Sequence, residues 1–385
     1  MTRRTFFATT LAALPSAAAN EPRPILVTAA QALKLRGAGS DVIRASVSEA
    51  LKAGPWTVTS KRPEHVDATP NDYYSEGPYW WPDPKNPSGP YIRKDGERYP
   101  GRFTANRNDL GSLCTAVLSL GMGAWMPGDK SCGAHAARIL STWFLDPKTR
   151  MNSNLEYGQA VRGINTGRGT GLIDTVSFIH LVQGVWLLEQ AAALDSAVAS
   201  GVREWFTAFT KWMTTSSKGL DEKKSGNNHA TWWTAQVAAY SALTGDAATQ
   251  ATSWDHYRKV LVPGQIRPDG SCPREEARTN SLSYSAMNLD AFAVICRIAE
   301  ANGVALWKYR APNAAAVEKA FHYLVPYLLR PDTWKKQQIS KFNPDSTVFP
   351  GLAAMGLKDD SLVAAWRSLP HGGSPWVQFA AALTR

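Results

Sequence analysis

Apolar residues recur at three- and four-residue intervals along most of this sequence, whereas alternation with a period of two is scarce. The first spacing puts apolar side chains on one face of an α-helix, and the second would put them on one face of a strand. Gly, Pro, Asn or Asp bound the periodic segments, as expected for helix ends. The predicted helices are Asp41–Ala53, Leu110–Ala124, Gly133–Phe144, Thr175–Ala193, Ala197–Met213, Ala230–Leu243, Leu282–Ala301, Ala314–Leu329, Gly351–Met355, Ser361–Arg367 and Pro375–Leu383.

This succession of helices without alternating strands predicts an all-α protein. No fixed-period repeat is visible, which argues against a solenoid, and no linker-like tract or shift in composition divides the chain. We therefore predict one domain over residues 20–385. A chain of this length suits a toroid, or incomplete barrel, of helical hairpins whose loops form a cleft at one mouth.

The first twenty residues have the composition of an export signal. Met1–Asn20 starts with two arginines, continues with an apolar stretch and ends in small residues, which is the order found in secretory signal peptides. The apolar stretch is too short to span a bilayer, and Pro15 interrupts it. We predict that residues 1–19 are a signal peptide, of the ordinary or the twin-arginine type. The mature protein is then expected to be periplasmic or secreted.

The chain has a formal charge of +10 at pH 7, which bears on the kind of molecule that it binds. A basic exported protein suits an anionic ligand, and an acidic polysaccharide meets that condition. Nucleic acid is also anionic, but the sequence has no lysine-rich arm and no nucleic-acid-binding motif. Charge alone does not choose between an anionic substrate and nonspecific adhesion to surfaces, but it fits an acidic polysaccharide as substrate. We expect no nucleic acid and no membrane span. The sequence does not specify an oligomeric state.

The cysteines give no indication of a metal site. The four cysteines are Cys114, Cys132, Cys272 and Cys296. No two of them form a C-x-x-C pair, and no histidine doublet lies near them. Two disulfides are possible in an oxidising compartment. Cys114 and Cys296, however, lie in apolar helical stretches and are expected in the core. We predict no metal and no other cofactor.

The first segment with candidate functional residues is Asn71–Gly101, inside the long loop Pro63–Arg107. Loops of this length in a compact domain are usually functional. Aromatic faces can bind the C–H surfaces of sugar rings, and arginines can pair with carboxylates. The alternative is a Pro-rich loop that its own aromatic residues pin to the domain. The substrate-binding candidates from this segment are Tyr74, Tyr79, Trp80, Trp81 and Arg93.

The second segment is Gly226–Gly245, where we expect Asn228 to cap the helix Ala230–Leu243 and His229 to lie at its start. A helix N-terminus favours negative charge, so this Asn-His pair is suited to receive a carboxylate. The alternative is a capping Asn beside a His with a local hydrogen bond. Trp232 and Trp233 follow in the same helix and are further substrate-binding candidates.

The third segment is Asp269–Asp290, in which Arg278 precedes a helix and Tyr284 lies in its first turn. Taken alone, Tyr284 has the alternative interpretation of a core tyrosine with a solvated hydroxyl group. A fourth and weaker segment, Met151–Asp174, is rich in glycine and contributes the substrate-binding candidates Tyr157, Gln159 and Arg168.

Together these segments resemble the alginate lyase-like families of polysaccharide lyases. The residues that carry the resemblance follow one another in matching order over more than half of the chain. They are Tyr73-Tyr74-Ser75, Pro78-Tyr79-Trp80-Trp81-Pro82-Asp83-Pro84, Pro90-Tyr91-Ile92-Arg93, Asp95-Gly96, Asn227-Asn228-His229, Thr231-Trp232, Glu276, Arg278-Thr279 and Tyr284-Ser285.

The resemblance implies an α/α toroid and catalytic roles for Asn228, His229, Arg278 and Tyr284. The sequence departs from the family pattern at Asn280 and Ser283, where bulkier basic residues are expected. It departs again after Trp232, where Trp233 and Thr234 replace a Tyr-Asp pair. These departures concern the choice of substrate more than the type of reaction.

The reaction that the resemblance implies is β-elimination, which needs residues of these types. The enzyme must neutralise the uronate carboxylate, for which Asn228 and Arg278 are suitable donors, before the C5 proton can leave. In mannuronate and glucuronate the C5 hydrogen and O4 lie on the same side of the ring, so Tyr284 alone can serve as base and acid. Our first hypothesis is this route, with Asn228, His229 and Arg278 holding the carboxylate. In guluronate the C5 hydrogen and O4 lie on opposite sides, so His229 and Tyr284 would share the task. For Tyr284 to act as a base, nearby cations must lower its pKa.

Two other functions remain open on the sequence. A glycoside hydrolase on a similar helical ring would need two carboxylates across the scissile bond, and no spacing singles out a pair. The candidates would be Asp174, Asp269, Glu275, Glu276 and Asp290. A non-catalytic periplasmic glycan-binding protein would need only the aromatic loop. Among uronate polymers we expect polymannuronate first and glucuronan next, because both permit the one-tyrosine route.

Overall fold

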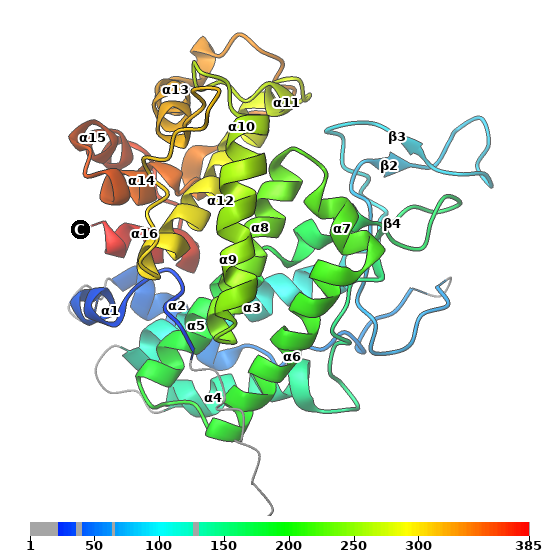
Figure 1. Cartoon of the computed structure of the whole chain (residues 1–385). Coiled ribbons are helices and arrows are strands. Elements are labelled where there is room, and N and C mark those ends of the chain that lie inside the picture. The colour runs from blue at the N-terminus through cyan, green and yellow to red at the C-terminus, as the bar shows by residue number, and fades with distance from the viewer. Residues whose placement is uncertain (1–21, 36–40, 64–65, 126–130, 385) are drawn as a thin grey trace, which may run out of the picture.

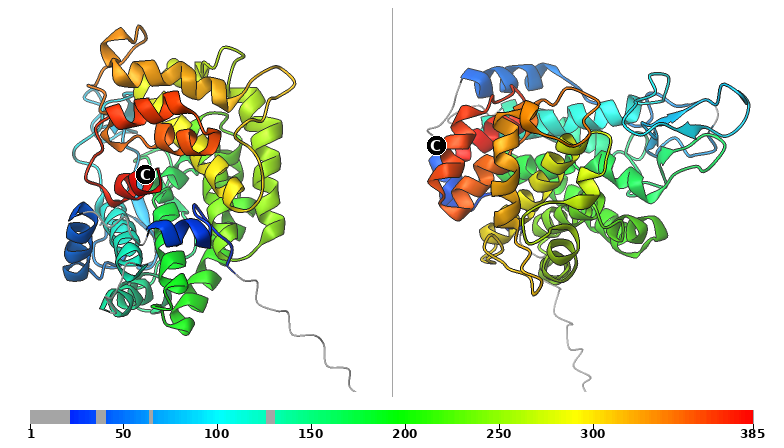
Figure 2. Two further views of the ribbon diagram at one scale, coloured as in Figure 1. Left: turned by 90° about the vertical axis from the view of Figure 1, so that its left-hand side faces the viewer. Right: turned by 90° about the horizontal axis from the view of Figure 1, so that it is seen from above.

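The computed structural model describes residues 22–35, 41–63, 66–125 and 131–384. The signal peptide predicted for residues 1–19 lies outside these ranges. Within them the chain is mainly helical, and its four strands are short and form no closed sheet. The all-α prediction is therefore confirmed. In Figures 1 and 2 the helices form one body, from which β2, β3 and β4 project on one side.

The helices account for most of the described chain. The α-helices are α1 Ala29–Leu35, α2 Asp41–Lys52, α3 Ala105–Trp125, α4 Ser131–Leu140, α5 Phe178–Gln190, α6 Ser196–Thr215, α7 Ser217–Lys223, α8 Asn228–Leu243, α9 Ala247–His256, α10 Val262–Gln265, α11 Pro273–Glu276, α12 Ser281–Ala301, α13 Val317–Leu329, α14 Phe349–Leu357, α15 Asp360–Ser368 and α16 Pro375–Leu383. Two π-helical segments are η1 Ser141–Leu145 and η3 Tyr257–Leu261. The 3₁₀ segments are η2 Gly169–Thr175, η4 Pro331–Thr333 and η5 Pro344–Ser346.

Most predicted helices are present, and the differences have physical reasons. The segment predicted as Thr175–Ala193 begins as the glycine-containing 3₁₀ segment η2, and α5 starts only at Phe178. Helix α9 was not predicted, because its buried face is mostly polar and gives little apolar periodicity. Helices α1 and α7 have only seven residues each, too few for a clear repeat.

Helices α8 and α12 form the centre of the bundle and pack against each other. Every residue of α8 from Ala230 to Leu243 is buried, as expected for a helix that is apolar on all sides. Helices α3 and α5 approach with their backbones in contact at Gly121 and Gly184. A Cβ atom on Gly121 would lie 2.5 Å from the Gly184 carbonyl oxygen, so glycine is required there. Because α8 and α12 are buried along their length, their N-termini are fixed where they reach the surface.

The segment predicted as a long loop, Pro63–Arg107, contains three short strands. Strands β2 Trp80–Trp81 and β3 Ile92–Arg93 pair antiparallel, with Trp80 opposite Arg93. Strand β1 Tyr74–Glu76 pairs in parallel with β4 Tyr157–Ala160. The two glycine- and aromatic-rich segments of the sequence therefore lie side by side, next to the helical body (Figure 1).

One hydrophobic core cluster extends from Ile25 to Ala381, and it includes Cys114 and Cys296 as predicted. The division into a signal peptide and a single domain over residues 20–385 stays a prediction. Among the residues that the structure describes, no single helix is long and apolar enough to cross a membrane. The bent pair η2 and α5 meets that criterion only by its length and composition.

Candidate active site

A cavity of about 790 Å³ lies between the strand-bearing loops and the N-termini of α8 and α12. It brings together nine of the predicted site residues from four separate segments. These residues are Tyr79, Trp80, Arg93, Gln159, Arg168, Asn228, His229, Arg278 and Tyr284. The four residues that were predicted to be catalytic therefore share one cavity.

The N-terminus of α8 presents Asn228 and His229 to this cavity. The N-cap is Asn227, one residue earlier than predicted, and its side chain accepts a hydrogen bond from the His229 backbone N–H. Asn228 is fully buried and is bound by Glu275. Its backbone N–H donates to Glu275 Oε1 at 2.6 Å, and its Nδ2 donates to Glu275 Oε2 at 2.8 Å.

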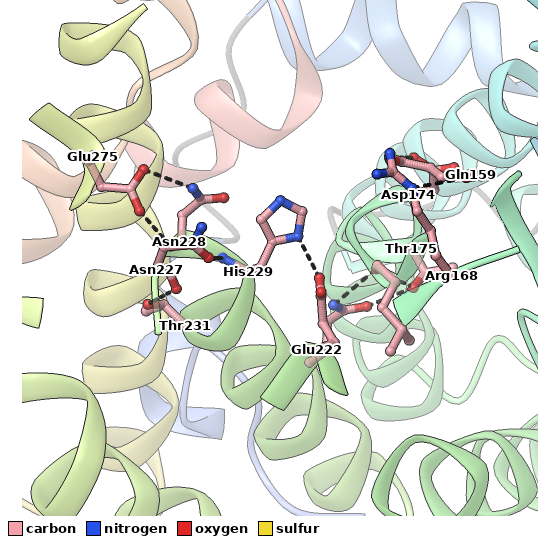
Figure 3. A network of polar contacts seen from close by, with 12 residues as sticks. Gln159, Arg168, Asp174, Thr175, Glu222, Asn227, Asn228, His229, Thr231 and Glu275 are labelled. Atoms are coloured by element: carbon pink, nitrogen blue, oxygen red, sulfur yellow. Dashed lines mark hydrogen bonds and ion pairs between the residues drawn. The ribbon is translucent and has the colours of Figure 1, made fainter. Parts of the chain in front are cut away.

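His229 is oriented by a buried carboxylate. Its Nδ1 lies 2.6 Å from Oε1 of Glu222, whose side chain is only 2% exposed. A carboxylate accepts the Nδ1 proton, which leaves the lone pair of the neutral ring on Nε2. In Figure 3 this second ring nitrogen points away from Glu222. His229 therefore has the orientation of a base or of a hydrogen-bonding group toward the cavity.

Tyr284, in the first turn of α12, makes two close contacts. Its hydroxyl group lies 2.6 Å from that of Tyr79. The guanidinium group of Arg278 lies 3.8 Å from the centre of its ring. Burial first, and then Tyr79, raise the pKa of Tyr284 above its usual value, and Arg278 offsets this only in part. Arg278 lowers the pKa of Tyr284 as expected, but the expectation that nearby cations bring this pKa below its usual value is wrong for this structure.

Arg278 is less available to Tyr284 than the sequence suggested, because Asp95 binds it. Its Nε and Nη2 donate to the two carboxylate oxygens of Asp95 at 3.2 and 2.9 Å. Thr279 and Arg93 also donate to Asp95. Arg93 comes from the loop side of the cavity, so this carboxylate joins the two walls.

The opposite wall is built around Gln159 and Asp174. Gln159 has a positive φ of 49°, an uncommon conformation for a residue other than glycine. Its Nε2 donates to Asp174, and its two oxygens accept from Arg168 at 2.9 and 3.0 Å. Burial and the charge of Arg93 lower the pKa of Arg168. A bound carboxylate would compensate for this unfavourable burial of a cation.

Five predicted substrate-binding residues do not line the cavity. Trp232 and Trp233 belong to the hydrophobic core and, unlike Asn228, do not line the cavity, so a direct contact with a sugar bound there is not available to them. Tyr74 is buried and donates to Glu76. Trp81 donates to the Glu97 carbonyl group, and Tyr157 donates to the Asp67 carbonyl group. These side chains fix local structure because their polar atoms are directed at the backbone or at a neighbouring carboxylate.

Sequence reasoning missed the acids that orient the site. Glu222 precedes His229 by seven residues on a different helix, and no spacing rule links them. Asp95 was noted only as part of a motif, and Glu275 only as a candidate carboxylate for hydrolysis. A search for carboxylates near each predicted donor becomes possible only once the fold is known. The described residues contain no group of three or more His, Cys, Asp or Glu side chains placed to hold a metal ion.

An all-helical fold with an arginine-rich cavity that holds His229 and Tyr284 defines the class as a polysaccharide lyase. Comparison with known proteins agrees: residues 57–334 match the family described as alginate lyase. The chain belongs to the alginate lyase family. No curated protein sequence matches it.

Solved structures give the same result. An alginate lyase from Bacteroides ovatus is 31% identical, with a TM-score of 0.86 over 94% of this chain and 99% of the other. Alginate lyase A1-III from Sphingomonas species A1 is 18% identical over 90% and 92% of the two chains, with a TM-score of 0.57. A variant of the latter has been solved with a tetrasaccharide. The fold is therefore an α/α toroid, as predicted.

Proposed function

We propose that this polysaccharide lyase cleaves a uronate polysaccharide by β-elimination and releases 4,5-unsaturated oligosaccharides. The observation that carries the proposal is the content of the cavity. Among the described residues that line it, five are arginines, at positions 93, 98, 107, 168 and 278, and one is a carboxylate, Asp174. Such a lining favours a polyanion. The similar structures are named as alginate lyases, and alginate is a uronate polymer.

The same lining is unfavourable for hydrolysis, which needs two carboxylates. Asp174 is occupied by hydrogen bonds from Tyr73, Ser75 and Gln159 and by an ion pair with Arg107. Glu275 accepts two hydrogen bonds from Asn228 and does not line the cavity. The other carboxylates considered from the sequence, Asp269, Glu276 and Asp290, do not line the cavity either.

The proton transfers are assigned to His229 and Tyr284. Since Tyr284 has a raised pKa, it is a phenol in the free protein and suits the delivery of a proton to the departing O4. His229 Nε2, with its ring oriented by Glu222, takes the C5 proton. Arg278 and Asn228 stabilise the carboxylate as negative charge grows on it. This division replaces the one-tyrosine route as our first mechanism.

Polymannuronate stays our preferred substrate and glucuronan the second. In both, the C5 hydrogen and O4 share one face of the ring, so His229 and Tyr284 would act from the same side. In guluronate they would act from opposite sides. The raised pKa of Tyr284 weakens the argument that favoured the same-side route, which makes polyguluronate a necessary part of the test.

The test is the ultraviolet absorbance of the purified protein mixed separately with polymannuronate, polyguluronate and glucuronan. Elimination creates a C4=C5 double bond conjugated to the carboxylate, so the product absorbs where the substrate does not. We expect the fastest rise with polymannuronate and no rise with the Tyr284→Phe variant. New reducing ends without a rise in absorbance would overturn elimination. A faster rise with polyguluronate would overturn the substrate preference.

We also propose that the protein is exported to the periplasm or secreted, on the basis of Met1–Asn20. Cell fractionation tests the location. Replacement of both Arg3 and Arg4 by lysine should retain the precursor in the cytoplasm if the route requires the twin-arginine pair. An ordinary signal should tolerate the change.

A further inference from the structure

The side chain of Asn228 is held in an orientation opposite to the one that its proposed role requires. Its Nδ2 donates to Glu275, and its Oδ1 is buried without a hydrogen-bond partner among the described residues. Figure 3 shows Asn228 between Glu275 and His229, with the Asn228 amide nitrogen directed at Glu275. Asn228 therefore has its donor end committed to Glu275 and its acceptor end unsatisfied.

This orientation is unfavourable for binding a uronate. A carboxylate only accepts hydrogen bonds, and an amide oxygen also only accepts. Two acceptors that face each other repel, and a buried acceptor without a donor has an energetic cost. The amide must present its nitrogen if Asn228 is to stabilise the substrate carboxylate.

The position of Glu275 explains why the nitrogen is turned away. Both carboxylate oxygens of Glu275 accept hydrogen bonds, one from the backbone N–H of Asn228 and one from Nδ2. An ionised carboxylate has no proton to give, so only the nitrogen end of the amide can satisfy it. A protonated carboxyl group could accept from the backbone N–H through one oxygen and donate through the other. It would then bind Oδ1 of an amide rotated by half a turn.

We propose that Glu275 is a positioning residue for the elimination and that its protonation turns the Asn228 amide nitrogen toward the substrate carboxylate. When Glu275 is ionised, the amide oxygen faces the substrate instead. One proton from solvent is taken up by Glu275, and no covalent bond other than this O–H bond forms. The inference rests on the proposed function, because it assigns the substrate carboxylate to Asn228.

The surroundings of Glu275 raise its pKa and so favour this protonation. Burial raises the pKa of Glu275, while hydrogen bonds from Asn228, the charge of Arg278 and, when its ring is protonated, His229 lower it. The net shift is upward. The N-terminus of α8 also favours the ionised form. Cys272 is a further titratable neighbour, and burial raises its pKa, so its thiol is neutral. A substrate carboxylate placed beside Asn228 adds a like charge, which raises the pKa of Glu275 further.

The decisive variant is Glu275→Gln. Glutamine has the shape of a protonated glutamate and does not titrate. Its amide nitrogen can donate to Asn228 Oδ1, and its oxygen can accept from the Asn228 backbone N–H. We expect kcat/KM within about threefold of wild type at the pH optimum. Above the optimum, wild type should lose about tenfold per pH unit, and the variant should keep its activity. The control is Glu300→Gln, since Glu300 accepts from Arg297 and Trp307 away from the cavity. It should keep the wild-type profile.

A second measurement needs no turnover. The side-chain amide resonance of Asn228, assigned by its loss in Asn228→Asp, should shift with pH in substrate-free wild type and stay constant in Glu275→Gln. A pH-independent resonance in wild type would overturn the inference. A folded Glu275→Gln variant that is at least about 100-fold less active at every pH would also overturn it. The same holds for a variant whose activity declines above the pH optimum as steeply as that of wild type. Failure of the proposed function would appear differently, as wild type that forms no unsaturated product while the resonance still shifts.

Discussion

The cavity has two walls that hold their side chains by different means. The N-termini of α8 and α12 form the helical wall, and β2, β3 and β4 form the strand wall. On the helical wall, His229 is bound by the buried Glu222 and Asn228 by the buried Glu275. On the strand wall, Trp80 and Arg93 project from a two-stranded hairpin. Arg93 is exposed, and Trp80 is partly exposed.

This difference indicates that the helical wall acts in catalysis and the strand wall in substrate binding. Rigid helices and buried carboxylates hold side chains in fixed positions. Such side chains can keep the precise distances and angles that stabilise a transition state. Residues on a narrow hairpin can contribute contact area and charge, which bind ground state and transition state alike. We therefore expect substitutions on the helical wall to lower kcat, and substitutions on the strand wall to raise KM.

The largest effect is expected at Tyr284. Tyr284→Phe removes the proton donor but keeps the ring under Arg278, so kcat should fall by at least about 10³-fold while KM changes little. The control is Tyr79→Phe, which removes only the neighbouring hydroxyl group on the strand wall and should change kcat by no more than about threefold. Both are measured by initial rates of ultraviolet absorbance. Equal losses in the two variants would show that Tyr284 is not the distinct proton donor.

The next effect is expected at Glu222. Glu222→Gln keeps the size of the side chain but removes the charge that favours a proton on His229 Nδ1, so kcat should fall by about 10- to 100-fold with KM nearly constant. Glu204→Gln is the matched control, since Glu204 is exposed on α6. A rise in KM alone would contradict the division between the walls, because it would mean that His229 only binds substrate.

The strand wall is tested by two adjacent tryptophans. Trp80 lines the cavity, whereas Trp81 packs on Tyr99 and donates to a backbone carbonyl group. Trp80→Ala should raise KM by about tenfold with little change in kcat. Trp81→Ala should have a smaller effect, limited to hairpin stability. If Trp80→Ala lowers kcat instead, the strand wall also orients the reacting groups.

The same contrast explains what the sequence could and could not predict. Tyr284 and His229 lie at the starts of helices whose apolar periodicity is clear, so their shared location follows from the fold. Trp232 and Trp233 were assigned to the substrate because aromatic residues suit sugars. The assignment ignored that α8 is buried on all sides, which leaves no room for a sugar.

The partners of the site residues follow no local pattern. Glu222 meets His229 only because α7 packs against the start of α8, and Asp95 meets Arg278 across 183 residues of sequence. Such contacts depend on the packing of elements, which periodicity does not specify. The strands were missed because each has only two to four residues, too few for alternation to show.

The smallest expected effect concerns Asp95, which joins the two walls. Partial burial raises the pKa of Asp95, but hydrogen bonds from Arg278, Thr279 and Arg93 together lower it to about 2. An unfolded aspartate titrates near pH 4. The stabilisation from this group is therefore complete above about pH 4 and is lost as the pH falls toward 2. Asp95→Asn should lower the free energy of unfolding by about 1 kcal/mol at pH 6, and the difference from wild type should shrink between pH 4 and 2. Urea unfolding at several pH values measures it, and a difference that stays constant over this range would show that Asp95 does not join the walls through its charge.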